Sequence, residues 1–281
     1  MSATPIEELI ADAGCFTCLG MSVAEALQVV LIDKISQLGP VASFIARGGV
    51  TDPVQISALN TLVLSAQSNG WWEKCDLIYP FVGGTAVAHA QNLKSTQFTI
   101  TWNGTVTHDA NGITGNGTTG YGNTGYSPAM GPGWSLDSAH LGFYFRNNGG
   151  GASVYGGADS GTVRANIGRP PFPATSAFGS INDNAGDGYA GLSLAWRMMS
   201  RTVSTTKHLF SGGVDNSTAR ASTSVINFPC FVLANDVSGV AGQFSSVNLA
   251  GMTGGAGISF AEYTAMAVDW QTFNTSLGRQ V

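Results

Sequence analysis

The sequence predicts a mainly β protein, a sandwich of two sheets, with helices before and after it. Charged residues make up only 10% of the 281 residues, against a usual share of about 25%, and acidic residues cluster in the first third of the chain. Further on, short runs rich in Val, Ile, Phe, Tyr and Thr alternate with Gly and Asn turns, as in all-β sandwiches and barrels. Helix-start signals appear near both ends of the chain.

Three helix starts precede residue 70. Thr4-Pro5-Ile6-Glu7 combines a capping box with a proline at the first helical position and predicts a helix over residues 5–13. Ser22-Val23-Ala24-Glu25 repeats the box and starts a second helix. Asp52-Pro53 opens a third, which Asn69-Gly70 ends.

The second of these helices has an apolar face that one short module cannot hide by itself. We therefore expect residues 1–70 to form a helical docking or oligomerisation segment, separate from a sandwich domain of residues 71–281. The side chains expected to make its docking face are Val23, Leu27, Val30 and Leu31, together with Ala26.

Residues 71–84 are predicted to form a hinge into the sandwich. Its strands are expected at residues 97–102, 140–146, 152–155, 162–167, 189–198, 207–210, 224–228, 231–234 and 243–248. In the 189–198 strand, Leu192, Leu194 and Trp196 alternate with more polar residues, which indicates one buried face. A last capping box at Ser259 predicts a C-terminal helix whose aromatic face, from Tyr263 to Phe273, caps the sandwich.

Charge and hydropathy exclude several classes of protein. A net charge of −5 and a pI of about 5.2 leave no basic stripe for phosphates, so we expect no nucleic-acid partner. The most apolar stretch, at Val29, is far shorter than the ~20 residues of a membrane span. Glu7 and Glu8 stand where a signal peptide would have its apolar region, so we expect synthesis and folding in a cytoplasm.

Nothing in the sequence marks a catalytic or cofactor site, and we expect neither. No predicted strand carries two acids at the spacing of a glycosidase pair. Asp183 and Asp187 are weak calcium candidates in an Asx-rich segment that we interpret as a turn, because the ordered ligand series of a calcium loop is missing. The histidines are predicted to stand alone at positions 89, 108, 140 and 208.

The cysteines are Cys15, Cys18, Cys75 and Cys230. The first two have the Cys-x-x-Cys spacing of zinc or redox sites, but a four-cysteine zinc site needs a second close pair. Free buried thiols are the reading we favour, with a zinc site, a redox pair or a later disulfide as alternatives.

Aromatic residues offer a second kind of site. Rings stack on the apolar faces of sugars, and Tyr121, Tyr126 and Trp134 lie in Gly-rich segments where an exposed ring is expected. Other aromatics of the β region are expected in the core. These three residues are therefore the candidates for a glycan-binding platform.

Three motifs in order resemble a group of tailed-bacteriophage virion proteins. They are Tyr79-Pro80-Phe81-Val82-Gly83-Gly84-Thr85, the stretch from Val106 to Tyr121 around Asn116-Gly117-Thr118, and the end of the chain from Trp270-Gln271-Thr272-Phe273 to Val281. The resemblance covers roughly residues 71–281 and implies a concanavalin A-like, LamG-type jelly roll closed by a terminal helix. A hydrophobic residue is usual where Gly115 stands, which predicts a distorted strand there. The catalytic strand motif of the glucanase branch has no match, and the calcium pattern of lectin-like relatives is not recognisable.

The function expected from these observations is that of a non-enzymatic virion structural protein: a capsid decoration, head fibre or tail fibre component at the virion surface, made in the host cytoplasm. Other capsid or tail proteins are the expected partners, with a homo-oligomer as the expected state and no membrane partner. The alternative is a carbohydrate-binding adhesin for host-surface glycans. A polysaccharide depolymerase is a third, remote class.

Overall fold

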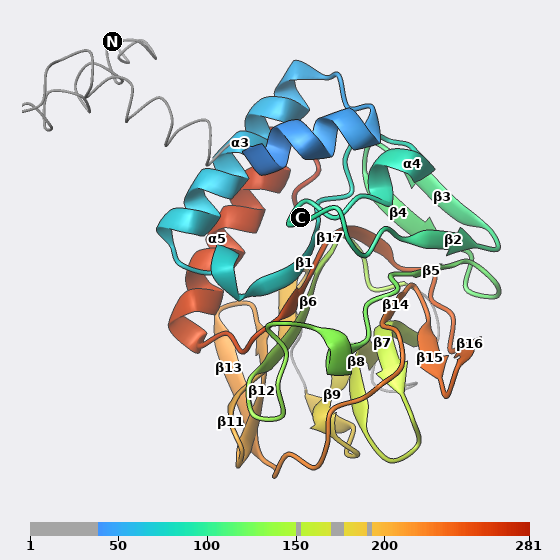
Figure 1. The fold of residues 1–281 in the computed structure, drawn as a ribbon, viewed down its shortest axis with the longest axis vertical. Coiled ribbons are helices and arrows are strands. Elements are labelled where there is room, and N and C mark those ends of the chain that lie inside the picture. The colour runs from blue at the N-terminus through green and yellow to red at the C-terminus, as the bar shows by residue number, and fades with distance from the viewer. Residues whose placement is uncertain (1–38, 150–152, 170–176, 190–192) are drawn as a thin grey trace, which may run out of the picture.

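The computed structural model describes residues 39–149, 153–169, 177–189 and 193–281, and two β-sheets lie face to face in it (Figure 1). The first sheet has the order β13-β12-β11-β6-β17-β4-β3, with β1 also paired to β17, and the second has the order β10-β9-β8-β7-β14-β5-β2, with β15 and β16 at its edge. The pairings are antiparallel except for that of β15 with β7. The predicted fold class, a mainly β two-sheet sandwich with helices, is confirmed.

The strands of the first sheet are β1 (Cys75–Tyr79), β3 (Val106–Asp109), β4 (Gly112–Gly115), β6 (Ala139–Phe145), β11 (Ala195–Val203), β12 (Thr206–Ser211), β13 (Val214–Ala219) and β17 (Asn248–Gly255). Those of the second are β2 (Thr101–Asn103), β5 (Tyr121–Asn123), β7 (Ser153–Asp159), β8 (Arg164–Arg169), β9 (Ala177–Asp183), β10 (Asp187–Tyr189), β14 (Phe231–Val232), β15 (Asn235–Val237) and β16 (Val240–Gly242). The helices are α3 (Pro53–Ser68), α4 (Ala86–His89) and α5 (Phe260–Ser276), besides helical residues 39–48 and the 3₁₀ turns η1 (Trp72–Lys74) and η2 (Pro128–Met130).

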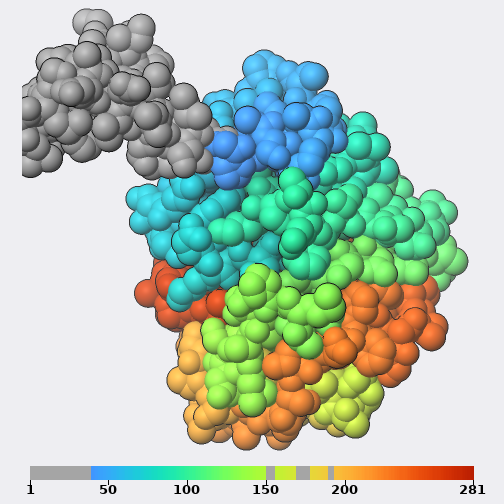
Figure 2. All heavy atoms as spheres, viewed as in Figure 1, coloured from blue at the N-terminus to red at the C-terminus, as the bar shows by residue number. Residues whose placement is uncertain are grey.

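The central strands of the first sheet, β6, β11 and β17, are buried on both faces along most of their length. Phe143 and Met199 point into the core between the two sheets, whereas their neighbours Tyr144 and Met198 join a second core beneath α3 and α5. Successive side chains of a strand point to opposite faces, so β6 is buried along its whole length without any polar alternation. The molecule therefore has three layers, and the helices in blue, cyan and red lie together at one side of it (Figures 1 and 2).

Local signals set both long helices. The Asp52 carboxylate accepts from the Val54 backbone N–H at 2.8 Å, and Gly70 takes the left-handed φ of +77° just past the end of α3. The predicted capping box of Ser259 and Glu262 is present at α5. Trp270 of α5 stacks on Trp196 of β11 at a centroid distance of 4.8 Å, so the aromatic face of this helix covers the sheet as predicted.

The predicted division at residue 70 does not separate two cores within the described residues. Val41, Phe44 and Leu59 share one hydrophobic cluster with Trp196 and Trp270. The helices expected at residues 5–13 and after Ser22, like the docking face Val23, Leu27, Val30 and Leu31, lie outside the described residues, and their role stays a prediction.

Several strand predictions are wrong. Residues 224–228 and 243–247 form no strand, although Ile226 and Val247 are buried as apolar anchors. The expected 189–198 strand is two strands, because the chain turns before Ala195, whose φ is +75°. The hinge at 71–84 contains β1, and the supposed turn around Asp183 contains the end of β9. Hydrophobic periodicity reports burial and cannot tell a paired strand from a buried coil.

Gly115 is a further correction. The distortion expected there is absent, since β3 and β4 pair without a register shift from Val106–Gly115 to Asp109–Gly112. A Cβ at this position would collide with the backbone oxygen of Ser245. Glycine is therefore required by the close approach of another segment.

A buried charge network joins the two sheets. The Asp183 carboxylate on β9 accepts from Arg201 of β11 at 3.0 Å and from Lys207 of β12 at 2.9 Å. All three side chains are at most 1% exposed. Opposite charges compensate one another in this position, and removal of the Asp183 charge would take a buried carboxylate from both cations, although Lys207 keeps its ion pair with Asp187.

Asp183→Asn should therefore lower the free energy of unfolding by about 3–5 kcal/mol, measured by urea denaturation at pH 7. Asp215→Asn is the matched control: Asp215 pairs with His208 at the surface, where its side chain is 31% exposed, and we expect a loss of less than about 1 kcal/mol there. Equal losses in the two variants would contradict a structural role for the buried network.

Candidate functional site

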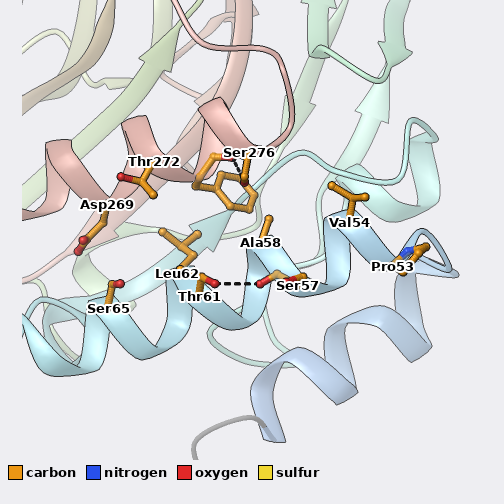
Figure 3. A pocket seen from close by; sticks show the side chains of 11 residues that line it. Pro53, Val54, Ser57, Ala58, Thr61, Leu62, Ser65, Asp269, Thr272 and Ser276 are labelled. Carbon is orange, nitrogen blue, oxygen red and sulfur yellow. Dashed lines mark hydrogen bonds between the residues drawn. The ribbon is translucent and has the colours of Figure 1, made fainter. Parts of the chain in front are cut away.

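A groove of about 390 Å³ lies between α3 and α5 on the outer side of the helical layer (Figure 3). Ala58, Leu62 and Phe273 form its apolar floor, each at most 5% exposed. Val54, 55% exposed, stands at its α3 N-terminal end. The rest of the lining is small or hydroxyl-bearing: Pro53, Ser57, Thr61, Ser65, Thr272 and Ser276, with Asp269 at the other end.

Fewer hydroxyl groups on the rim of the groove are available to bind a ligand than their number suggests. Thr61 Oγ1 donates to the Ser57 carbonyl at 3.1 Å, and Ser276 Oγ donates to the Phe273 carbonyl at 2.8 Å, as the dashed lines in Figure 3 show. Hydroxyls that bond back to their own helix turn are satisfied without a ligand. The groove has an apolar floor and a rim of short side chains, so it suits an apolar row of side chains on a binding partner.

The carboxylate at the end of the groove has a structural task. Asp269 accepts from Trp71 Nε1 at 2.7 Å and from Asn69 Nδ2 at 2.9 Å, which ties the end of α3 to α5. Burial raises the pKa of Asp269 above its usual range, and the two donated hydrogen bonds oppose that rise. Its donors orient it toward the protein, so the groove has no free acid for catalysis at this end.

A second cavity, of about 250 Å³, shares Val54 and Ser276 with the groove and extends it toward the end of the chain. Val82, Ala110 and Arg279 line it, one from each of the three motifs on which the family resemblance rests. The groove residues were not predicted from sequence. The one available signal was the four-residue spacing of Ser57, Thr61 and Ser65 on a helix, which also occurs on solvated faces.

The predicted glycan platform needs correction. Tyr126 and Trp134 are buried in the inter-sheet core, where Tyr126 donates to Asp76 at 2.7 Å and Trp134 donates to Asn182 at 2.9 Å. Buried rings offer no face to a sugar. Gly-rich surroundings suggested exposure, but in this fold glycines let the backbone approach these rings: a Cβ at Gly131 would collide with Tyr126.

Tyr121 differs from the other two aromatic candidates. It is only partly buried on β5, and its ring lies 4.8 Å from that of Phe231 and 6.1 Å from that of Phe244. Asn123 lies two residues further along the same strand and is also partly exposed, so both side chains are on one face. Tyr121 is thus the one candidate of the predicted platform that is not buried.

The two weak calcium candidates are held by cations of the protein. Asp183 lies in the buried network, and Asp187 forms ion pairs with Lys207 and Arg220, each at 2.9 Å. These partners hold the pKa of Asp187 below its usual value against the raising effect of its burial. Within the described ranges, no group of three or more His, Cys, Asp or Glu side chains is placed to hold a metal ion.

Two of the histidines predicted to stand alone face each other. His89 Nδ1 on α4 and His108 Nδ1 on β3 are 3.1 Å apart, and Trp102 packs on His108. Burial, with smaller contributions from His108 and Arg279, lowers the pKa of His89 to about 3. The pair is therefore neutral at pH 7 and shares one ring N–H. Chain segments that are distant in sequence bring these rings together, so their spacing could not reveal the contact.

Cys75 and Cys230 are free and buried, as the sequence analysis favoured. Cys15 and Cys18 lie outside the described residues. No helix in the described part of the chain has the length and apolar character of a membrane span.

No protein-family model matches this chain, and no curated protein matches it either. Among solved structures it is similar to the NanB sialidase from Streptococcus pneumoniae, at 12% identity and a TM-score of 0.37, over 46% of this chain and 24% of that chain. Other neighbours are the Ruminococcus gnavus IT-sialidase CBM40, at 8% identity and 0.35 over 48% and 83%, and Domain 4 of AbnA, an arabinanase from Geobacillus stearothermophilus, at 13% and 0.45 over 69% and 98%.

These neighbours are sialidase and carbohydrate-binding β-sandwich domains, and this chain spans about a quarter of the NanB chain. With TM-scores below 0.5, the similarity says nothing about what this chain binds or whether it is an enzyme.

The His89 ring predicts a pH dependence of stability. Its folded-state pKa of about 3 is below the ordinary 6.5, so between these values the unfolded chain binds one proton more than the folded chain. Stability must then fall as the pH falls through that window. Between pH 6 and pH 4, the wild type should lose about 1.4 kcal/mol per pH unit more than His89→Gln, measured by urea denaturation at several pH values. Parallel profiles for the two proteins would refute this.

Proposed function

We propose that this protein is a non-enzymatic structural component of a bacteriophage virion, which displays its β-sandwich on the particle surface and is attached through the helical N-terminal part of the chain. One observation carries the proposal. The three motifs that resemble virion proteins are separated by up to about 200 residues in sequence, yet Val82, Ala110 and Arg279, one from each, line a single cavity.

Direct hydrogen bonds link the first motif to the last. The Arg279 guanidinium donates to the carbonyls of Pro80 and Phe81, each at 2.7 Å. Separate motifs that meet in three dimensions are what a shared structural unit produces, whereas chance matches would fall anywhere on the surface. This convergence supports the resemblance as a likeness of fold and of structural role.

A structural role also agrees with the contacts of three carboxylates, of which Asp183 and Asp269 are buried and Asp76 is half-buried. Asp183 joins the two sheets, Asp269 joins α3 to α5, and Asp76 accepts from Tyr126 and from the Gly133 backbone. Each of these carboxylates is committed to contacts between elements of the fold. Glycosidase chemistry would need two carboxyl groups facing a substrate.

The attachment is tested by truncation at residue 38. A longer deletion would remove α3 and expose Trp71 and the α5 face that α3 covers, so failure to fold would imitate failure to attach. The chain from residue 39 should still fold and be absent from purified particles of the source phage, while the full chain is incorporated. Quantitative mass spectrometry of the particles measures this.

Incorporation of the truncated chain at wild-type level would contradict attachment through residues 1–38. Gold-labelled antibody against residues 81–281 tests the virion role itself: discrete label on heads or tails supports it, and particles without label, although the full chain is expressed, contradict it.

A second candidate, binding of host-surface glycans, rests on Tyr121. Its partly exposed ring, steadied by Phe231, and the neighbouring Asn123 amide are a stacking face and a hydrogen-bonding group on one side of β5.

If this is a glycan site, Tyr121→Ala should weaken retention on immobilised host polysaccharide about tenfold or more, which corresponds to ~1.4 kcal/mol. Tyr121→Phe keeps the ring and should retain most of the binding. Trp102→Ala, on β2 beside His108, is a control for the general loss of an aromatic side chain. Unchanged retention in Tyr121→Ala, or no retention of the wild type, would remove the glycan candidate.

A further inference from the structure

The groove between α3 and α5 has the shape and lining of a binding site for a further helix. Its floor is apolar along roughly the first half of α3, where Ala58 and Leu62 lie, and Phe273 of α5 completes this floor. Ser57, Thr61 and Ser65 follow one another at four-residue spacing on α3, and Thr272 and Ser276 do so on α5 (Figure 3). Small side chains on these rows leave room for the ridge of a neighbouring helix.

The chain outside the described residues supplies a matching ridge. The helix predicted from Ser22 carries Val23, Leu27, Val30 and Leu31 on one face, and Glu25 on the opposite face. The apolar face of the predicted helix carries no charge. The groove does not require a polar partner either, because rim hydroxyls such as those of Thr61 and Ser276 already bond within their own helices. We infer that residues 22–32 of the same chain dock in the α3–α5 groove of the free protein.

The connection is long enough. The described chain begins with the helix of residues 39–48, which lies beside α3 in Figure 3, and its Val41 and Phe44 belong to the same hydrophobic cluster as Leu59 of α3. Residues 33–38 can span up to ~20 Å when extended, and the 16 residues of α3 measure about 24 Å in length. The linker can therefore cover most of the length of α3 from a starting point beside this helix.

Tethering favours this segment over a second copy. A short linker gives its own segment an effective concentration in the millimolar range, whereas a second molecule must lose translational and rotational freedom on association. Docking also hides an apolar face that would otherwise be exposed. Its regulatory meaning rests on the proposed function: the face would have to leave the groove before it could bind another virion protein.

Disulfide trapping in the full chain tests this inference. The background carries Cys15→Ser and Cys18→Ser, while Cys75 and Cys230 stay because they are buried. Leu27→Cys is combined with Thr61→Cys, an exposed position on the groove rim, and oxidised at low micromolar concentration. We expect most of the protein to form an intramolecular disulfide, seen as a faster band on non-reducing gels that lacks two free thiols by mass spectrometry.

The matched control is Glu25→Cys with Thr61→Cys, whose cysteine lies on the polar face of the predicted helix and should cross-link at least fivefold less. Equal cross-linking of the two pairs, disulfide-linked dimers as the main product, or no cross-link would each overturn the inference, and dimers would identify a second copy as the occupant. The experiment uses free protein without phage particles, so its failure is separate from a failure of the proposed virion role.

Discussion

The buried guanidinium of Arg279 is the contact on which the arrangement of layers depends. It donates to Pro80 and Phe81 just after β1, to the Ala250 carbonyl of β17 at 3.1 Å, and to Asn274 Oδ1 of α5 at 2.7 Å. Neutral oxygens thus surround this charge, and burial lowers its pKa to about 9. A planar group with five donors can hold such divergent acceptors. The chain end, α5 and the first sheet are therefore fixed relative to one another.

That anchoring explains why the charged side chains of the interior serve to hold elements of the fold together. Once α5 lies on the first sheet, both faces of its central strands are buried, and a charge that points inward there must find a partner inside. Arg201 and Lys207 do so in the Asp183 carboxylate of the opposite sheet. Since buried polar groups are costly without partners, the fold uses its buried acids to join elements. In the described part of the chain, two features at the periphery suit binding: the α3–α5 groove and Tyr121.

Those two features differ in how far the sequence could reveal them. Tyr121 was a candidate because an aromatic in a Gly-rich stretch is often exposed, and the same argument failed for Tyr126 and Trp134. What distinguishes them is the packing partner: Tyr126 reaches the Asp76 carboxylate from a distant element, whereas Tyr121 rests on Phe231 at the outside of β5. The groove was not predicted at all, because it exists only between two helices whose sequences are about 200 residues apart.

The sequence by itself determined what depends on neighbouring residues. Asp52 and Ser259 mark helix starts because a cap bonds to an N–H two or three residues away, and the fold class follows from short apolar runs and turns. The tertiary structure alone decided the contact of His89 with His108, the burial of Asp183 and the need for glycine at position 115. Each of these depends on which distant segment packs opposite, and local periodicity contains no information about that segment.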